Sequence, residues 1–116
     1  MKKTLIATAT YNEAKNIKIL INRINNLKTK LDILIIDDNS PDGTSLVIKQ
    51  LKKRFKNINL IERSKKSGLD SAHKLIYSYA LRKNYHYLIT MDADLSHNPK
   101  TIPKFLKMIN IEESPY

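Results

Sequence analysis

The chain has 116 residues, the length of a single domain, with 41% hydrophobic residues and a formal net charge of +10. It has no cysteine, which excludes a disulfide scaffold, a cysteine nucleophile and a thiolate zinc site. No apolar run approaches the roughly 18–20 residues that cross a bilayer, and polar residues follow the basic and apolar start too soon for a signal peptide. We therefore expect a cytoplasmic protein. Its charge indicates an anionic partner, which could be nucleic acid, an anionic membrane surface or a phosphorylated small molecule, unless the lysines are simply solvated.

Strand and helix patterns alternate along the chain. In order, we expect a strand at 4–9, a helix at 14–28, a strand at 33–36, a helix at 44–56, a more polar strand at 59–62, a helix at 69–84 and a strand at 87–91. Asn98 and Pro99 open a last helix. The two glycines, Gly43 and Gly68, are expected to need a special backbone. This order predicts an α/β fold of three layers, a mostly parallel Rossmann-like sheet of about four strands with about four helices.

Acidic residues gather just after the expected strands, where sheets of this kind bind their ligands. Six of the eleven are placed there: Glu13, Asp37, Asp38, Asp42, Asp92 and Asp94. Some have structural explanations, because Asn12 or Glu13 could cap the first helix and Asp42 could cap a helix or brace a turn. Two carboxylate pairs remain, and carboxylates repel one another unless a cation joins them. The clustering therefore favours a metal site.

The segment Asp92-Ala93-Asp94 is the best candidate for that site. In extended backbone, residues two apart point the same way, so both carboxylates converge on one point. Such oxygen ligands suit Mg²⁺ or Mn²⁺, which keep positions for substrate phosphates. His97 lies nearby, and we interpret it as a loop residue rather than a ligand.

Four segments of the chain, ATATYNEAKNI, LIIDDNSPDGT, RSKKSGLDSA and ITMDADLSHNPKTIPKF, resemble the family-2 glycosyltransferases of GT-A fold. Within that family they are most similar to the dolichyl- or polyprenyl-phosphate mannosyltransferases. The resemblance covers residues 5–108 and only the first, nucleotide-sugar-binding half of the family's catalytic domain. It therefore implies one glycosyltransferase-like domain over residues 1–116 that is truncated relative to the family.

The resemblance also implies a donor site. Ala9, Tyr11 and Glu13 match positions that border the base and ribose, although Ala9 stands where the family has proline. Ile36 and Asp38 match positions that contact the nucleoside. The remaining matches, to a DXD-type motif that holds the metal and the donor diphosphate, are Asp92, Ala93 and Asp94.

One residue departs from the family's pattern, and one basic loop has two alternative interpretations. Asp70 puts a charge where the family keeps glycine, either as a helix cap or as a perturbation of the site. The basic loop of Arg63, Lys65 and Lys66 could clamp a phosphate near a helix N-terminus, but a solvated basic turn is the favoured interpretation.

The first hypothesis is inverting, metal-dependent transfer of a hexosyl group, mannosyl before others, from a nucleotide sugar to a polyprenyl (dolichyl) phosphate, or the donor-binding half of such an enzyme. GDP-mannose is the expected donor, and no catalytic base is assigned. The alternative is a nucleotide-sugar-binding or interaction module without activity of its own. A basic nucleic-acid binder comes last, because no groove-reading motif is present. The chain could also contact a partner chain or the cytoplasmic face of a membrane.

Overall fold

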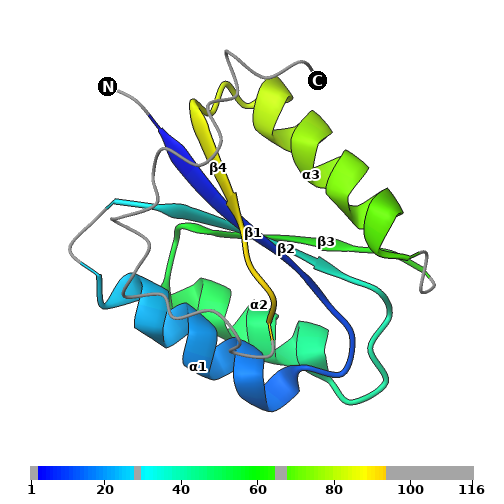
Figure 1. Cartoon of the computed structure of the whole chain (residues 1–116). Helices are drawn as coiled ribbons and strands as arrows, with labels where there is room; N and C mark the ends of the chain where they lie inside the picture. Colours follow the sequence, from blue (N-terminus) through cyan, green and yellow to red (C-terminus); the bar gives the residue numbers. More distant parts are fainter. Residues whose placement is uncertain (1–2, 28–29, 65–67, 94–116) are drawn as a thin grey trace.

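The computed structural model describes residues 3–27, 30–64 and 68–93. Strands and helices alternate through them (Figure 1): β1 (Thr4–Thr10), α1 (Ala14–Asn25), β2 (Asp32–Asp37), α2 (Thr44–Arg54), β3 (Ile58–Glu62), α3 (Leu69–Arg82) and β4 (Tyr87–Thr90). All seven elements overlap the ranges expected from the sequence. The helix expected after Asn98 lies outside the described residues.

The four strands form one parallel sheet in the order β3-β2-β1-β4. Helices α1 and α2 cover one face and α3 covers the other (Figure 1), which confirms the three-layer α/β prediction. The strand order explains the polar composition of β3. It is an edge strand that pairs only with β2 among the described strands, and most of its residues are half-buried.

Each face of the sheet has its own core. On one side, Ile17, Leu20, Ile21 and Ile24 of α1 are almost fully buried. Their spacing of three and four residues puts them on one side of the helix. On the other side, Ala72, Ile76 and Ala80 of α3 face the sheet. The central strands β1 and β2 supply both cores, and the run Ile33–Ile36 of β2 is accordingly apolar on both faces.

Helix α1 ends at Asn25, three residues earlier than the sequence pattern predicts. The Asn22 amide donates to the Lys18 carbonyl at 2.8 Å, and the Asn25 amide donates to the Ile21 carbonyl at 3.1 Å. Asparagine side chains compete in this way with the backbone for hydrogen bonds, which weakens the last turn. The run of asparagines therefore stops the helix although Leu27 continues its apolar spacing.

Both glycines have positive φ, 85° at Gly43 and 92° at Gly68, as expected. Each stands immediately before a helix, α2 and α3 respectively. Asn39 also lies in the left-handed region with φ 54°, a conformation that asparagine adopts more readily than most residues. These turns lie where the chain leaves the sheet after β2 and β3 and enters α2 and α3.

Candidate functional site

The strand order defines a switch point between β1 and β4. From β1 the chain moves outward through β2 to β3, with both connecting helices on one face, and then returns across α3 to place β4 on the other side of β1. All strands are parallel, so all their carboxyl ends lie at one edge. In open α/β sheets, ligands bind in the crevice outside the carboxyl ends at such a point.

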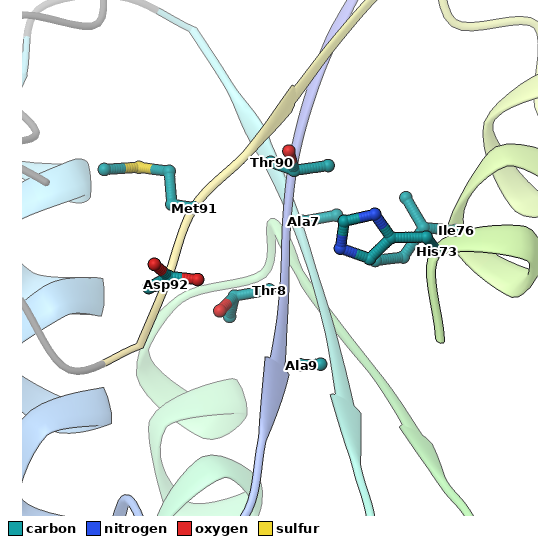
Figure 2. A pocket seen from close by; sticks show the side chains of 8 residues that line it. All are labelled: Ala7, Thr8, Ala9, His73, Ile76, Thr90, Met91 and Asp92. Atoms are coloured by element: carbon teal, nitrogen blue, oxygen red, sulfur yellow. The ribbon is translucent and has the colours of Figure 1, made fainter. Parts of the chain in front are cut away.

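A pocket of about 110 Å³ occupies this position (Figure 2). The pairing of β1 with β4 ends at Ala7 and Thr90, and the Met91 backbone N–H still donates to the Ala7 carbonyl at 3.0 Å. The pocket lies where β1 and β4 leave this register. Its lining comes from β1, from the end of β4 and the residues after it, and from α3: Ala7, Thr8, Ala9, His73, Ile76, Thr90, Met91 and Asp92. Of the predicted donor-site residues, Ala9 and Asp92 are thus brought together.

His73 also belongs to this pocket, although no sequence motif singled it out. It lies three residues before the buried Ile76 on α3, and Figure 2 shows both side chains reaching from α3 toward β1. The helical spacing from Ile76 was the signal that could have found it. His73 adds a group that can donate or accept a hydrogen bond to a mostly apolar lining.

The Thr8 hydroxyl is the one buried side-chain polar atom without a hydrogen-bond partner among the residues that the structure describes. Its residue is 3% exposed. An unsatisfied buried hydroxyl costs free energy, because it gave up its bonds to water on folding.

Asp38 follows β2 at the same edge of the sheet, but it does not line this pocket. It is 6% exposed, and its carboxylate forms a two-pronged ion pair with the Arg63 guanidinium. Nε of Arg63 donates to Oδ1 at 2.5 Å and Nη2 donates to Oδ2 at 2.7 Å. Arg63 also donates to the Ser71 hydroxyl at 2.7 Å and to the Gly68 carbonyl at 3.2 Å. Arg63 therefore ties the end of β2 to the start of α3 and is not a solvated turn residue; Lys65 and Lys66 lie outside the described residues.

Asp37 is also held by the protein itself. Its carboxylate accepts hydrogen bonds from the Thr10 hydroxyl at 2.7 Å and from the Ser40 hydroxyl and backbone N–H at 2.6 and 3.1 Å. The aspartate pair after β2 is thus stabilised by hydrogen-bond donors and an arginine. A bound cation is not needed to explain it, which corrects that part of the sequence argument.

Asp42 caps two helices at once. It accepts a hydrogen bond from the Ala14 backbone N–H at 3.2 Å, at the start of α1, and from the Thr44 backbone N–H at 3.0 Å, at the start of α2. The Thr44 hydroxyl also donates to it, and this bond is the main reason why the pKa of Asp42 lies below its ordinary value. Glu13 occupies the N-cap position of α1, but its side chain makes no capping bond. The capping role considered for Asn12 or Glu13 therefore belongs to Asp42.

The other predicted site residues differ in their access to a ligand. Tyr11 is 41% exposed at the carboxyl edge, and Glu13 is half-buried and lines a second hollow of about 420 Å³ at the start of α1. Ile36 is fully buried under α3, and Ala93 is 4% exposed in the core beneath α1 and α2. Asp94 lies outside the described residues.

Asp92 is the described member of the predicted metal pair. It is exposed, stands two residues after β4 and lines the pocket at the switch point. A carboxylate at this place is a suitable oxygen ligand for Mg²⁺ or Mn²⁺. Within residues 3–27, 30–64 and 68–93 no group of three or more metal-ligating side chains converges, so a cation here would take most of its ligands from Asp94, a bound diphosphate and water.

Comparison with known proteins places the chain in a family. Residues 5–114 match the family model described as glycosyl transferase family 2, and the chain belongs to that family. It is 32% identical to polyprenol monophosphomannose synthase of Mycolicibacterium smegmatis over 110 residues, and this alignment covers 94% of this chain and 42% of the relative. It is 30% identical to undecaprenyl-phosphate mannosyltransferase of Micrococcus luteus over 107 residues, and this alignment covers 92% of this chain and 44% of the relative.

Solved structures show the same fold. A mannosyltransferase of Pyrobaculum calidifontis, in complex with GDP-Man and Mn²⁺, superposes with a TM-score of 0.68 at 23% identity, over 79% of this chain and 27% of that one. TarS of S. aureus in complex with UDP superposes with a TM-score of 0.71 at 18% identity, over 91% of this chain and 32% of that one. The chain thus has the GT-A fold of these neighbours and spans less than half the length of the curated relatives it matches.

Proposed function

We propose that this chain is the donor-binding half of a glycosyltransferase that moves a hexosyl group, mannosyl before others, from a nucleotide sugar to a polyprenyl phosphate. The observation that carries the proposal is the pocket at the switch point, where Ala9 of β1 and Asp92 after β4 lie together. We limit the proposal to a donor-binding half because the chain covers only 42% and 44% of two relatives whose names state this kind of transfer.

The chain's own residues would bind and orient the donor. Tyr11 and Glu13 offer an exposed ring and a half-buried carboxylate beside β1, suited to a nucleoside. Asp38 is held in place by Arg63 at the carboxyl edge of the sheet, at a position that matches the nucleoside contact of the family. Asp92 and Asp94 would hold Mg²⁺ or Mn²⁺. When bound, the cation would supply positive charge that stabilises the leaving diphosphate. GDP-mannose is the proposed donor, and the neighbour solved with GDP-Man and Mn²⁺ supports both ligands.

A phosphate acceptor suits these residues because it needs no general base. Its oxygen is already an anion and can attack the anomeric carbon from the face opposite the leaving group, which inverts the configuration. The two buried carboxylates of the described residues, Asp37 and Asp38, are occupied by hydroxyl, backbone and guanidinium donors. Neither is placed to take a proton from a sugar hydroxyl.

Thermal melting in four conditions tests the donor site: no ligand, Mn²⁺, GDP, and both. Two carboxylates leave an octahedral ion largely hydrated, so Mn²⁺ and GDP are expected to stabilise the fold together by more than the sum of each alone. At about 100 times the Kd the joint gain is about 2.7 kcal/mol. Asp92→Asn and Asp94→Asn should each abolish the joint gain without destabilising the free protein.

The matched control is Asp32→Asn. Asp32 begins β2 at the opposite edge of the sheet, where it accepts a hydrogen bond from the Tyr85 hydroxyl at 2.6 Å. This variant should keep the full joint shift. Independent action of Mn²⁺ and GDP in the unaltered chain, or a full joint shift in Asp94→Asn, would contradict a metal-bridged donor site.

A binding module without activity of its own is the second candidate, and the short span relative to the relatives favours it. A single-turnover assay with radiolabelled GDP-mannose and a short polyprenyl phosphate shows whether residues 1–116 transfer the sugar by themselves. Donor binding without transfer identifies a binding module that needs a second half, whereas transfer by residues 1–116 identifies a complete enzyme.

A further inference from the structure

The positive charge of this protein is unevenly distributed along the chain. Residues 14–31 contain five lysines or arginines and no acid, and residues 43–61 contain five more and again no acid. Together these two stretches account for the whole net charge of +10. The remaining 11 basic residues are balanced by all 11 acidic ones.

The fold brings both stretches to one face of the molecule. They contain α1 and α2, which pack side by side beneath the sheet, whereas α3 lies on the opposite face (Figure 1). We call the outer surface of α1, α2 and their C-terminal turns the basic layer. Its exposed basic residues in the described part of the chain are Lys15, Lys18, Arg23, Lys30, Lys49, Lys52, Lys53, Arg54 and Lys56.

Among the residues that the structure describes, few interactions neutralise this charge. Lys49 pairs with Glu62 at 3.2 Å, and both side chains are about half exposed (53% and 46%). The Arg54 guanidinium lies 5.0 Å from the centre of the Phe55 ring. Nine exposed cations on one layer repel each other, which a domain tolerates at some cost in stability. An anionic surface facing them would remove that cost.

Two large apolar side chains are exposed on the same layer. Leu46 of α2 is 63% exposed and Ile19 of α1 is 42% exposed. Leu46 shares the outward side of α2 with Lys49 and Lys53, at spacings of three and seven residues. Lysines around exposed aliphatic side chains suit a helix surface that lies on lipid headgroups. Neither α1 nor α2 contains an aromatic residue. Single-stranded nucleic acid would instead call for aromatic stacking platforms.

We propose that the basic layer docks on an anionic lipid bilayer, with its lysines against the lipid phosphates and Leu46 and Ile19 among the headgroups. This inference goes beyond the proposed donor site and does not depend on it. Docked in this way, the sheet lies parallel to the membrane, and its carboxyl edge, with the pocket beside Asp92, opens along the bilayer surface.

Vesicle sedimentation tests the proposal, with phosphatidylcholine mixed with phosphatidylglycerol against phosphatidylcholine alone, and with neither polyprenyl phosphate nor nucleotide present. Each basic residue at an anionic surface contributes about fivefold to binding. Changing Lys52, Lys53 and Lys56 to Gln should therefore lower binding to the mixed vesicles by about 100-fold. The matched control changes Lys74, Arg82 and Lys83 on the α3 side to Gln. It removes the same charge and should lower binding by less than about threefold, because it acts only at long range.

A fluorescence measurement locates the contact directly. The chain has no tryptophan, so Leu46→Trp and Leu81→Trp each introduce a single reporter, on α2 and α3 respectively. Leu81 is 43% exposed, which makes it a fair control. Anionic vesicles should shift the emission of Leu46→Trp to shorter wavelength and leave Leu81→Trp unchanged.

Equal loss of vesicle binding in the two triple variants, or equal emission shifts in the two tryptophan variants, overturns the proposal. So does absence of vesicle binding by the unaltered chain. A labelled DNA duplex provides the competing outcome: duplex binding that depends on Lys52, Lys53 and Lys56, without vesicle binding, would make the basic layer a nucleic-acid surface. None of these results bears on the shift caused by Mn²⁺ and GDP, so the donor site and the docking surface fail independently.

Discussion

Removing Arg63 should destabilise this protein more than removing any other surface-proximal charge that the structure describes. The Arg63 and Asp38 side chains are 13% and 9% exposed, and two hydrogen bonds join them. Arg63→Met leaves the Asp38 carboxylate nearly buried without its cation, and breaking a buried pair in this way costs 3–5 kcal/mol. The residual exposure lets water reach the carboxylate, so we expect about 3 kcal/mol, close to the lower limit.

Three companion variants separate the ion pair from its geometry. Arg63→Lys keeps the charge but loses the two-pronged contact and the bonds to Ser71 and Gly68, so it should cost about 1–2 kcal/mol. Asp38→Leu removes the other partner. The double variant, Arg63→Met with Asp38→Leu, should be more stable than Arg63→Met alone, because no charge is then left unpaired.

Urea unfolding followed by circular dichroism measures these differences, with an unchanged m-value as the check that the unfolded state is the same. For a domain of this size, 3 kcal/mol corresponds to a fall of about 12 °C in Tm. A loss below about 1 kcal/mol in Arg63→Met, or strictly additive losses in the double variant, would refute the reasoning.

Three smaller effects should follow from other contacts. Asp42→Ala removes the side-chain cap of two helices and should cost about 1–2 kcal/mol. Folding lowers the pKa of Asp42, so the ionised carboxylate contributes fully to the free energy of unfolding above the ordinary value of 3.8, and this contribution is lost as pH falls through the folded pKa. Asp42→Asn should therefore be less stable than the parent at pH 7 and equally stable in strong acid. Thr8→Val removes an unsatisfied buried hydroxyl and should stabilise by about 1 kcal/mol in urea unfolding. Gly68→Ala should cost about 2–3 kcal/mol through its backbone conformation (φ 92°, ψ 159°), which is essentially restricted to glycine, although no atom lies within 4 Å of the added Cβ. Asn39→Gly, also at positive φ, should not destabilise.

Local patterns in the sequence determined the elements and the fold class. Ile17, Leu20 and Ile24 repeat with the helical period, and the apolar run from Ile33 to Ile36 has no polar face. Burial of one helix stripe, or of both faces of a central strand, requires these patterns whatever the neighbours are. The placement of acids after strands likewise predicted the carboxyl edge as the ligand side, because parallel strands bring such residues together.

The sequence could not show which acids are engaged within the protein. Asp38 pairs with Arg63 across 25 residues, and Asp42 reaches back 28 residues to cap the helix at Ala14. Side-chain partners at such separations depend on the sheet register and the loop paths. Clustered aspartates therefore looked alike in sequence, although the structure uses Asp37, Asp38 and Asp42 as structural groups. Asp92 is exposed and lines the pocket.

The tertiary structure alone decided the strand order and, with it, the place of the site and of the charge. A β-α alternation is compatible with several orders, and only the return of β4 to the far side of β1 creates the switch point at which His73 joins Asp92. The same topology places α1 and α2 on one face. Net charge is a property of the chain, but its concentration on one layer follows from which crossover helices share a side of the sheet, because right-handed crossovers fix that side once the strand order is set.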